Sequence, residues 1–189
     1  MATPKSQRIA IWVIAAVMAI GTIGTYFALV LGNTNDADET AQQQKIYDDY
    51  IAQMKKQQEE RQKTLRPLDG YEAAAFNATD IKELKSDVLV EGSGEELKAD
   101  SKVTINYFGW TADGKIFDST NVNGTTTPND QLALDGVIKG WTEGLTGKKV
   151  GSTVKLTIPA DKAYGNSDDG TGSPTGPLMF IVEIKAIRT

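Results

Sequence analysis

The side chains that could carry out chemistry form a restricted set, because the 189 residues include neither histidine nor cysteine. The chain therefore cannot form a Ser-His-Asp triad, a Cys-His pair or a histidine-ligated metal centre. Disulfides, zinc–thiolate sites and iron–sulfur clusters are excluded for the same reason. Any catalysis must rely on other polar groups and on the environment that the fold provides.

One acidic cluster could suggest a calcium site. Asn166, Asp168 and Asp169 lie close together in a polar segment. An EF-hand loop, however, requires a D-x-[DN]-x-[DN]-G spacing and a distal glutamate, and that spacing is absent. We expect a solvated loop here, and we predict neither a metal nor a cofactor.

Short motifs follow one another through the C-terminal half of the chain. In order they read VLVEGSG (88–94), DSKVTINYFG (100–109), DGKIFDS (113–119), VIKGWTEGL (137–145), VGS (150–152), KLTIP (155–159), AYG (163–165) and LMFIVEI (178–184). Each motif alone is weak evidence, but together their order and spacing resemble the FKBP-type peptidyl-prolyl cis–trans isomerases. The similarity covers about residues 84–189.

The resemblance implies a curled antiparallel sheet wrapped across one short helix, with a shallow aromatic pocket between them that receives proline. It also implies proline-containing polypeptides as clients and macrolides as a further ligand class. The catalytic residues carried over are Tyr107, Asp118 and Tyr164. The substrate-binding residues carried over are Phe117, Val137, Ile138, Trp141 and Phe180, with Trp141 as the pocket floor.

Isomerisation of an X–Pro bond suits a chain of this composition. Amide resonance gives that rotation a barrier of ~18–20 kcal/mol, but crossing it breaks no covalent bond and needs no nucleophile. The twisted amide has lost its resonance and its carbonyl carbon is less polar. A dry apolar pocket therefore favours it over the planar ground state, which is catalysis by differential binding.

Each of these residues also has a purely structural interpretation. Trp141 and Phe180 are types that commonly fill a core, and Tyr164 could be buried with a bonded hydroxyl. Asp118 could be a turn or capping acid. The ordered series of motifs favours the functional interpretation for all of them together.

The sequence departs from the family pattern in three places. The segment Thr120–Thr127 lacks the basic residue that many active members place after F-D-S to pair with the aspartate. The strand expected at 130–134 lacks the usual aromatic pair, with Leu132 in one position. The loop 165–176 has none of the apolar residues that overhang proline in active members, so we expect it to be mobile and to close poorly on substrate.

The elements that must position these residues are short strands and one helix. Apolar and polar residues alternate in the segments 103–108, 154–158 and 178–184, as in half-buried strands. A short helix is expected at 138–145, between glycine turns. The prediction is an α+β domain over residues 78–189, with one helix packed on an antiparallel sheet.

The N-terminal region predicts a membrane anchor. Residues 9–31 carry no charge, and ~20 such residues suffice to cross a bilayer. Lys5 and Arg8 precede this span and acidic residues follow it, so residues 1–8 are expected in the cytoplasm and the domain outside. A cleaved signal peptide is the alternative, but its apolar region would be shorter and would end in small residues.

The region 32–77 is expected to form a connector, a helical stalk and a linker. Residues 41–66 contain neither glycine nor proline, and Ile46, Tyr50 and Met54 form a short apolar stripe. A coiled-coil dimer would need a longer heptad pattern, which favours a solvated spacer helix and leaves the oligomeric state open. Such a helix would hold the domain up to ~40 Å from the bilayer.

Three functions are compatible with this organisation. The net charge of −5 disfavours nucleic-acid binding. The leading prediction is a membrane-tethered prolyl isomerase for exported proteins. The alternatives are a proline-binding chaperone module with little or no isomerase activity, which the polar 165–176 loop favours, and a structural tether that merely presents its domain.

Overall fold

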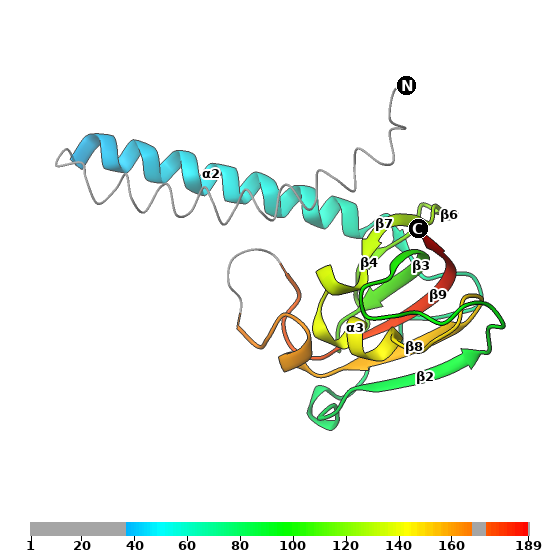
Figure 1. Ribbon diagram of the computed structural model, residues 1–189. Helices are drawn as coiled ribbons and strands as arrows, with labels where there is room; N and C mark the ends of the chain where they lie inside the picture. The colour runs from blue at the N-terminus through cyan, green and yellow to red at the C-terminus, as the bar shows by residue number, and fades with distance from the viewer. Residues whose placement is uncertain (1–36, 168–172, 189) are drawn as a thin grey trace, which may run out of the picture. The chain divides into compact units, whose positions relative to one another are not determined.

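The computed structural model describes residues 37–167 and 173–188 (Figure 1). The expected anchor at 9–31 lies outside the described residues. Within these two ranges, no helix is both long enough and apolar enough to cross a membrane. The chain divides into two compact units, and residues Glu60–Ser167 and Pro174–Thr189 form the second, which we call the C-terminal unit.

The stalk helix α2 spans Ala37–Gln62, so it begins and ends earlier than the expected 41–66. On its surface Gln44 Nε2 donates to Asp48 Oδ1 at 3.0 Å, and the apolar Ile46 side chain is 63% exposed. The helix ends where Thr64 donates from both its backbone nitrogen (2.9 Å) and its hydroxyl (2.6 Å) to the Arg61 carbonyl. These bonds satisfy a carbonyl that the helix end leaves without an intrahelical partner. The spacer interpretation stays a prediction.

The C-terminal unit is built on an antiparallel sheet with strand order β2-β8-β9-β3-β4, and β7 also pairs with β3. Its strands are β2 (Lys85–Val90), β3 (Lys102–Trp110), β4 (Ile116–Ser119), β7 (Asn129–Ala133), β8 (Thr153–Ile158) and β9 (Leu178–Arg188). A smaller sheet joins β1 (Leu65–Arg66), β5 (Asn121–Val122) and β6 (Thr125–Thr126). In the described part of the unit, three short 3-10 helices lie in the connections, η1 (Ala78–Asp80), η2 (Leu134–Gly136) and η3 (Ala160–Lys162).

Helix α3 (Lys139–Leu145) packs across one face of this sheet (Figure 1). Two of its residues, Gly140 and Gly144, face the sheet so closely that an added Cβ would lie 2.4 Å from Ile158 and 2.7 Å from Leu156. Glycine is a poor helix former, so tertiary packing rather than propensity holds this helix. The α+β prediction of a sheet with one packed helix is confirmed.

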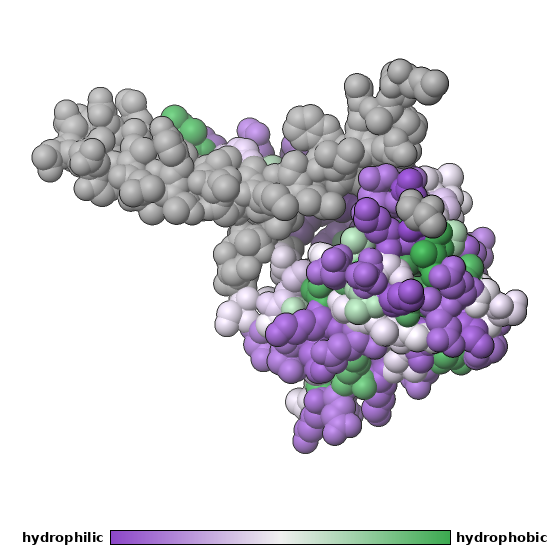
Figure 2. Space-filling model, in the orientation of Figure 1, coloured by the Kyte–Doolittle hydropathy of each residue, from purple (hydrophilic) through white to green (hydrophobic). Residues whose placement is uncertain are grey.

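The main core lies between α3 and the sheet. Its buried members come from α3, from the strands and from the loops that flank them: Leu97, Val103, Ile105, Leu134, Trp141, Leu145, Val154, Leu156, Ile158, Leu178, Phe180, Val182 and Ile184. The outer surface is different. In the view of Figure 2, polar residues predominate on the C-terminal unit and apolar residues form small separate patches.

A second apolar cluster differs from the sequence expectation. Leu68, Phe108, Trp110 and Ile181 are buried together, and Trp110 Nε1 donates to the Ala74 carbonyl at 2.9 Å. The segment 65–76 therefore packs onto the domain, although we expected residues 65–66 to end the stalk helix and residues 68–76 to belong to a linker. The compact unit begins at Glu60 rather than at residue 78. The physical reason is that β3 is buried on both faces from Phe108 to Trp110, and β9 from Phe180 to Val182, so the face away from α3 needs this cover.

Candidate active site

The centre of the candidate site is the carboxylate of Asp118. It lies on β4 opposite Gly109 of β3, and its side chain is 33% exposed. Oδ2 accepts a hydrogen bond from the Tyr107 hydroxyl at 2.5 Å. Oδ1 accepts from the Ser119 backbone nitrogen at 3.0 Å and from Arg61 Nη2 at 3.2 Å. Both carboxylate oxygens therefore have fixed donors.

The Tyr107 hydroxyl remains a donor because its pKa is raised well above the ordinary value of 10.0. Burial is the largest cause, and the negative charge of Asp118 together with the hydrogen bond to it adds to the effect. Arg61 acts in the opposite direction and lowers the pKa of Tyr107. Tyr107 therefore donates to Asp118 as an uncharged phenol.

Aromatic rings extend from Tyr107 in an edge-to-face series. The rings of Tyr107 and Trp141 are 5.2 Å apart, those of Trp141 and Phe180 are 5.2 Å apart, and those of Phe180 and Phe117 are 5.5 Å apart. Such perpendicular contacts add to the stabilisation that burial gives. Trp141 and Phe180 are 4% and 3% exposed, so the series has a buried centre. It presents a rigid apolar surface beside a carboxylate.

The backbone of β3 makes room for two of these rings. A Cβ added at Gly109 would lie 2.4 Å from Phe180 Cε1 and 2.8 Å from Phe117 Cζ. These distances are far shorter than the ~3.5–4.0 Å of a favourable carbon contact. Only glycine at this position allows the two rings to lie where they do.

Residues at the start of α3 border the same core. Ile138 is the N-cap residue, and its carbonyl accepts from the Trp141 nitrogen at 2.9 Å. Val137 and Ile138 are partly buried against the main core. A surface hollow of about 460 Å³ lies beside α3, lined by Ala99, Asp100, Asp135, Val137, Lys139, Thr142 and Glu143. Of the expected site residues, only Val137 lines that hollow.

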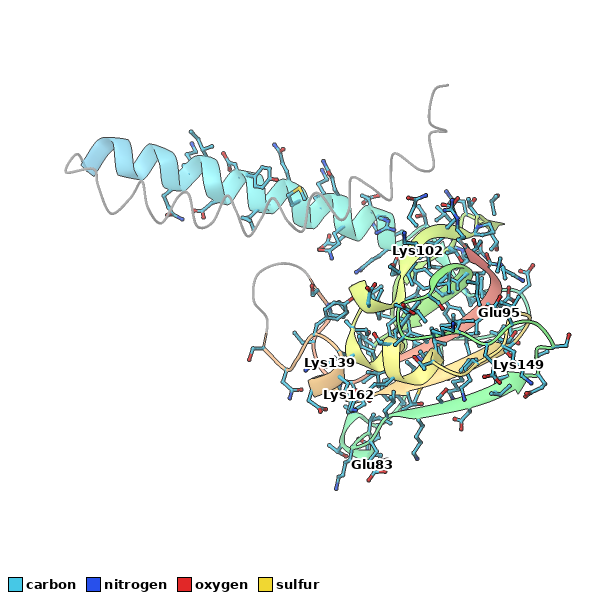
Figure 3. All side chains as sticks on the ribbon, viewed as in Figure 1. Glu83, Glu95, Lys102, Lys139, Lys149 and Lys162 are labelled. Carbon is cyan, nitrogen blue, oxygen red and sulfur yellow. The ribbon has the colours of Figure 1, made fainter. Side chains whose placement is uncertain are left out.

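Tyr164 stands at the exposed edge of the site. It is 48% exposed, and within 37–167 and 173–188 its hydroxyl has no hydrogen-bond partner. Partial burial, followed by the charge of Asp118, raises its pKa from 10.0. An ion pair between Lys162 and Glu143 joins η3, which lies just before Tyr164, to α3 (Figure 3). Tyr164 therefore offers an uncharged hydroxyl that has no hydrogen-bond partner among the described residues and that feels the charge of Asp118.

The loop that follows Tyr164 has a closed base. The Gly176 nitrogen donates to the Gly165 carbonyl at 2.8 Å, and both glycines have positive φ (81° and 90°), a conformation that favours glycine. Residues 168–172 lie outside the described residues, so the expected mobility of this loop stays a prediction. In the described ranges no group of acidic side chains is arranged to hold a metal ion.

Comparison with known proteins identifies the family. A model of the FKBP-type peptidyl-prolyl cis-trans isomerase family matches residues 93–185. The chain is 39% identical over 102 residues to the probable FK506-binding protein of Corynebacterium glutamicum, and the match covers 52% of this chain and 81% of that protein. The chain belongs to the FKBP-type peptidyl-prolyl cis-trans isomerase family.

One curated relative of this FKBP-type domain is a larger protein. The chain is 40% identical over 101 residues to the FKBP-type peptidyl-prolyl cis-trans isomerase FkpA of Escherichia coli, covering 53% of this chain and 36% of that protein. It thus spans about a third of that relative's length. A crystal structure of a peptidyl-prolyl cis-trans isomerase from Pseudomonas syringae shows 28% identity and a TM-score of 0.48, covering 83% of this chain and all of that one.

The FKBP-type domain brings most of the expected site residues together. The aromatic series and the Tyr107–Asp118 bond join four elements, β3, β4, α3 and β9. Tyr164 is linked to these residues electrostatically, because, besides burial, the charge of Asp118 raises the pKa of the Tyr164 hydroxyl. Sequence reasoning missed Arg61, which lies 57 residues before Asp118, in the expected stalk. The sequence offered one signal for this residue. The segment 120–127 contains no basic residue, so a cation that pairs with Asp118 had to come from elsewhere in the chain.

Proposed function

We propose that the chain catalyses cis–trans isomerisation of X–Pro bonds in proline-containing polypeptides. The observation that carries this proposal is the buried aromatic series ending at a hydroxyl–carboxylate pair, Tyr107 and Asp118. Membership of the isomerase family supports it. The chemistry also needs only what this chain has, since no step requires histidine or cysteine.

In the proposed mechanism, the apolar rings stabilise the twisted amide. Proline would lie against Trp141, with Phe117 and Phe180 as walls, so that water is excluded from the rotating bond. The less polar carbonyl carbon of the twisted amide favours that environment, which lowers the barrier relative to water. Val137 and Ile138 would border the substrate backbone at the start of α3.

Two polar groups have separate proposed roles. The Tyr164 hydroxyl would donate to the substrate carbonyl, since it is exposed and has no partner within the described ranges. The fixed carboxylate of Asp118 would act electrostatically on the rotating amide. Preorganised dipoles of this kind act without reorganisation cost during the reaction.

The proposed place of action is outside the cytoplasm. Residues 9–31 would anchor the chain in a membrane, with Lys5 and Arg8 on the cytoplasmic side and exported proteins as clients. Protease added to intact cells should then remove the domain. Protection of the domain in intact cells, with cleavage only after lysis, would contradict this topology.

A protease-coupled assay on X–Pro peptides tests the activity. The full chain, purified in detergent because of its apolar segment, should accelerate isomerisation. The polar loop at 165–176 favours a second function, binding of proline segments or macrolides with little catalysis. A chain that binds proline peptides but gives no acceleration at high enzyme concentration would establish that alternative.

A further inference from the structure

The ion pair between Arg61 and Asp118 connects the stalk helix to the candidate site. Arg61 lies in the last turn of α2, and its Nη2 is 3.2 Å from Asp118 Oδ1. The two side chains are 28% and 33% exposed, so both are largely withdrawn from solvent. The segment 120–127, which follows Ser119 directly, contains no basic residue. Arg61 therefore supplies the cation that the local sequence lacks.

The position of Arg61 is set by a run of contacts along the neighbouring backbone. The segment 64–67 pairs with the segment 119–123, which follows Asp118 directly. Leu65 lies opposite Val122 in the β1–β5 pairing, and Leu65 is only 4% exposed. The Asn123 nitrogen donates to the Thr64 carbonyl at 2.8 Å.

Two side chains reinforce this pairing. Ser119 Oγ donates to the Arg66 carbonyl at 2.7 Å, and Asn121 Nδ2 donates to the Pro67 carbonyl at 2.8 Å. Ser119 and Asn121 are buried. Arg61 and Asp118 are thus brought to the same place by two segments fastened side by side, and their contact does not depend on two free side chains meeting in solvent.

Arg61 and Tyr107 hold different oxygens of the Asp118 carboxylate. Oδ2 of Asp118 binds the Tyr107 hydroxyl, and Oδ1 binds Arg61, so the guanidinium and the phenol fix opposite oxygens. Removal of Arg61 would take away the only charged one of the donors described here and leave Oδ1 with the Ser119 nitrogen alone, so that the carboxylate is held less firmly. The aromatic rings would not be disturbed, because none of the ring contacts involves Arg61.

We infer that Arg61 is a positioning residue of the isomerase site, which orients Asp118 from the C-terminal end of α2. This inference rests on the proposed function. It makes the last turn of α2 part of the enzyme: a chain that lacks residue 61 would keep every residue of the site motifs and still have a misdirected carboxylate.

The test compares full-length variants in detergent. Arg61→Ala removes the pair, Arg61→Lys keeps the charge, and Lys63→Ala is the matched control, which removes a charge that pairs with exposed Glu60. We expect Arg61→Ala to lower kcat by about 3- to 10-fold, the range for a partly exposed charged hydrogen bond. KM should change little, Arg61→Lys should recover part of the loss, and Lys63→Ala should match the wild type.

A double-mutant cycle separates positioning from stability. If Arg61 acts through Asp118, then Arg61→Ala should have no further effect on kcat in an Asp118→Ala background. Thermal unfolding of each variant shows whether any loss of activity reflects unfolding. Equal kcat for Arg61→Ala and wild type, or the same kcat loss with and without Asp118, would overturn the inference. An inactive wild type would instead overturn the proposed function itself.

Discussion

Substitution of Gly109 by alanine should disturb the aromatic series directly. The added methyl carbon would lie 2.4 Å from Phe180 Cε1, 2.6 Å from Phe180 Cδ1 and 2.8 Å from Phe117 Cζ. To restore an ordinary carbon contact, the Phe180 ring must move by about 1 Å. That ring has edge-to-face contacts with both Trp141 and Phe117, so it cannot move alone. Overpacking of this kind costs about 1–3 kcal/mol.

The measurement is urea unfolding of the full chain, followed by the X–Pro isomerisation assay on the folded variant. The matched control is Gly136→Ala, because a Cβ there meets nothing within 4 Å. We expect Gly109→Ala to lose both stability and kcat, whereas Gly136→Ala should keep both. A Gly109→Ala variant with the stability and kcat of the wild type would refute the argument that these rings are fixed in one arrangement.

Three further predictions concern the second cluster, the sheet and the exposed hydroxyl. Leu68→Ala should lower the free energy of unfolding by about 2–5 kcal/mol, because Leu68 is only 3% exposed. Urea unfolding measures this free energy. Burial raises the pKa of Glu183, but hydrogen bonds from Lys185 and Asn106 outweigh burial and hold it below its ordinary 4.5. The carboxylate therefore stabilises the fold above pH 4.5 and loses this effect as the pH falls through the lowered pKa. Glu183→Gln should flatten the loss of stability in acid, as measured by unfolding across pH. Tyr164→Phe should lower kcat by about 2- to 10-fold, the value of one hydrogen bond, without a change in thermal unfolding; an unchanged kcat would show that the hydroxyl does not contact substrate.

The sequence predicts those parts of the fold whose burial follows a local period. Alternation located β3, β8 and β9, and the glycine turns located α3, within a few residues. The same alternation gave the wrong expectation for the face of the sheet that points away from α3, which it predicted to be exposed. Phe108 and Ile181 occupy positions that a half-buried strand would expose, yet both are buried. Their cover, residues 65–76, has no periodic pattern of its own.

In the candidate site, too, the sequence predicts the residues that lie inside local motifs but not the one that comes from a distant segment. Tyr107, Asp118 and Trp141 were predicted because each lies inside a motif, and the structure brings them into contact. Arg61 lies inside no motif. Its contact with Asp118 depends on the pairing of 64–67 with 119–123, which involves polar side chains and only short strands. No local pattern in the sequence encodes that pairing.

The closed base of the loop after Tyr164 has a consequence for how this domain can diversify. Gly165 and Gly176 are joined by a hydrogen bond, and the described residues 166–167 and 173–175 between them lie outside the β8–β9 pairing, which ends at Ile158 and Leu178. The cost of closing such a loop grows only with the logarithm of its length, by about 0.6 kcal/mol for each doubling. The donors of Asp118 are Tyr107, Ser119 and Arg61, so insertions or exchanges in this segment replace none of them. The surface that follows Tyr164 can thus change by replacing one loop, while the residues that hold the carboxylate keep their positions.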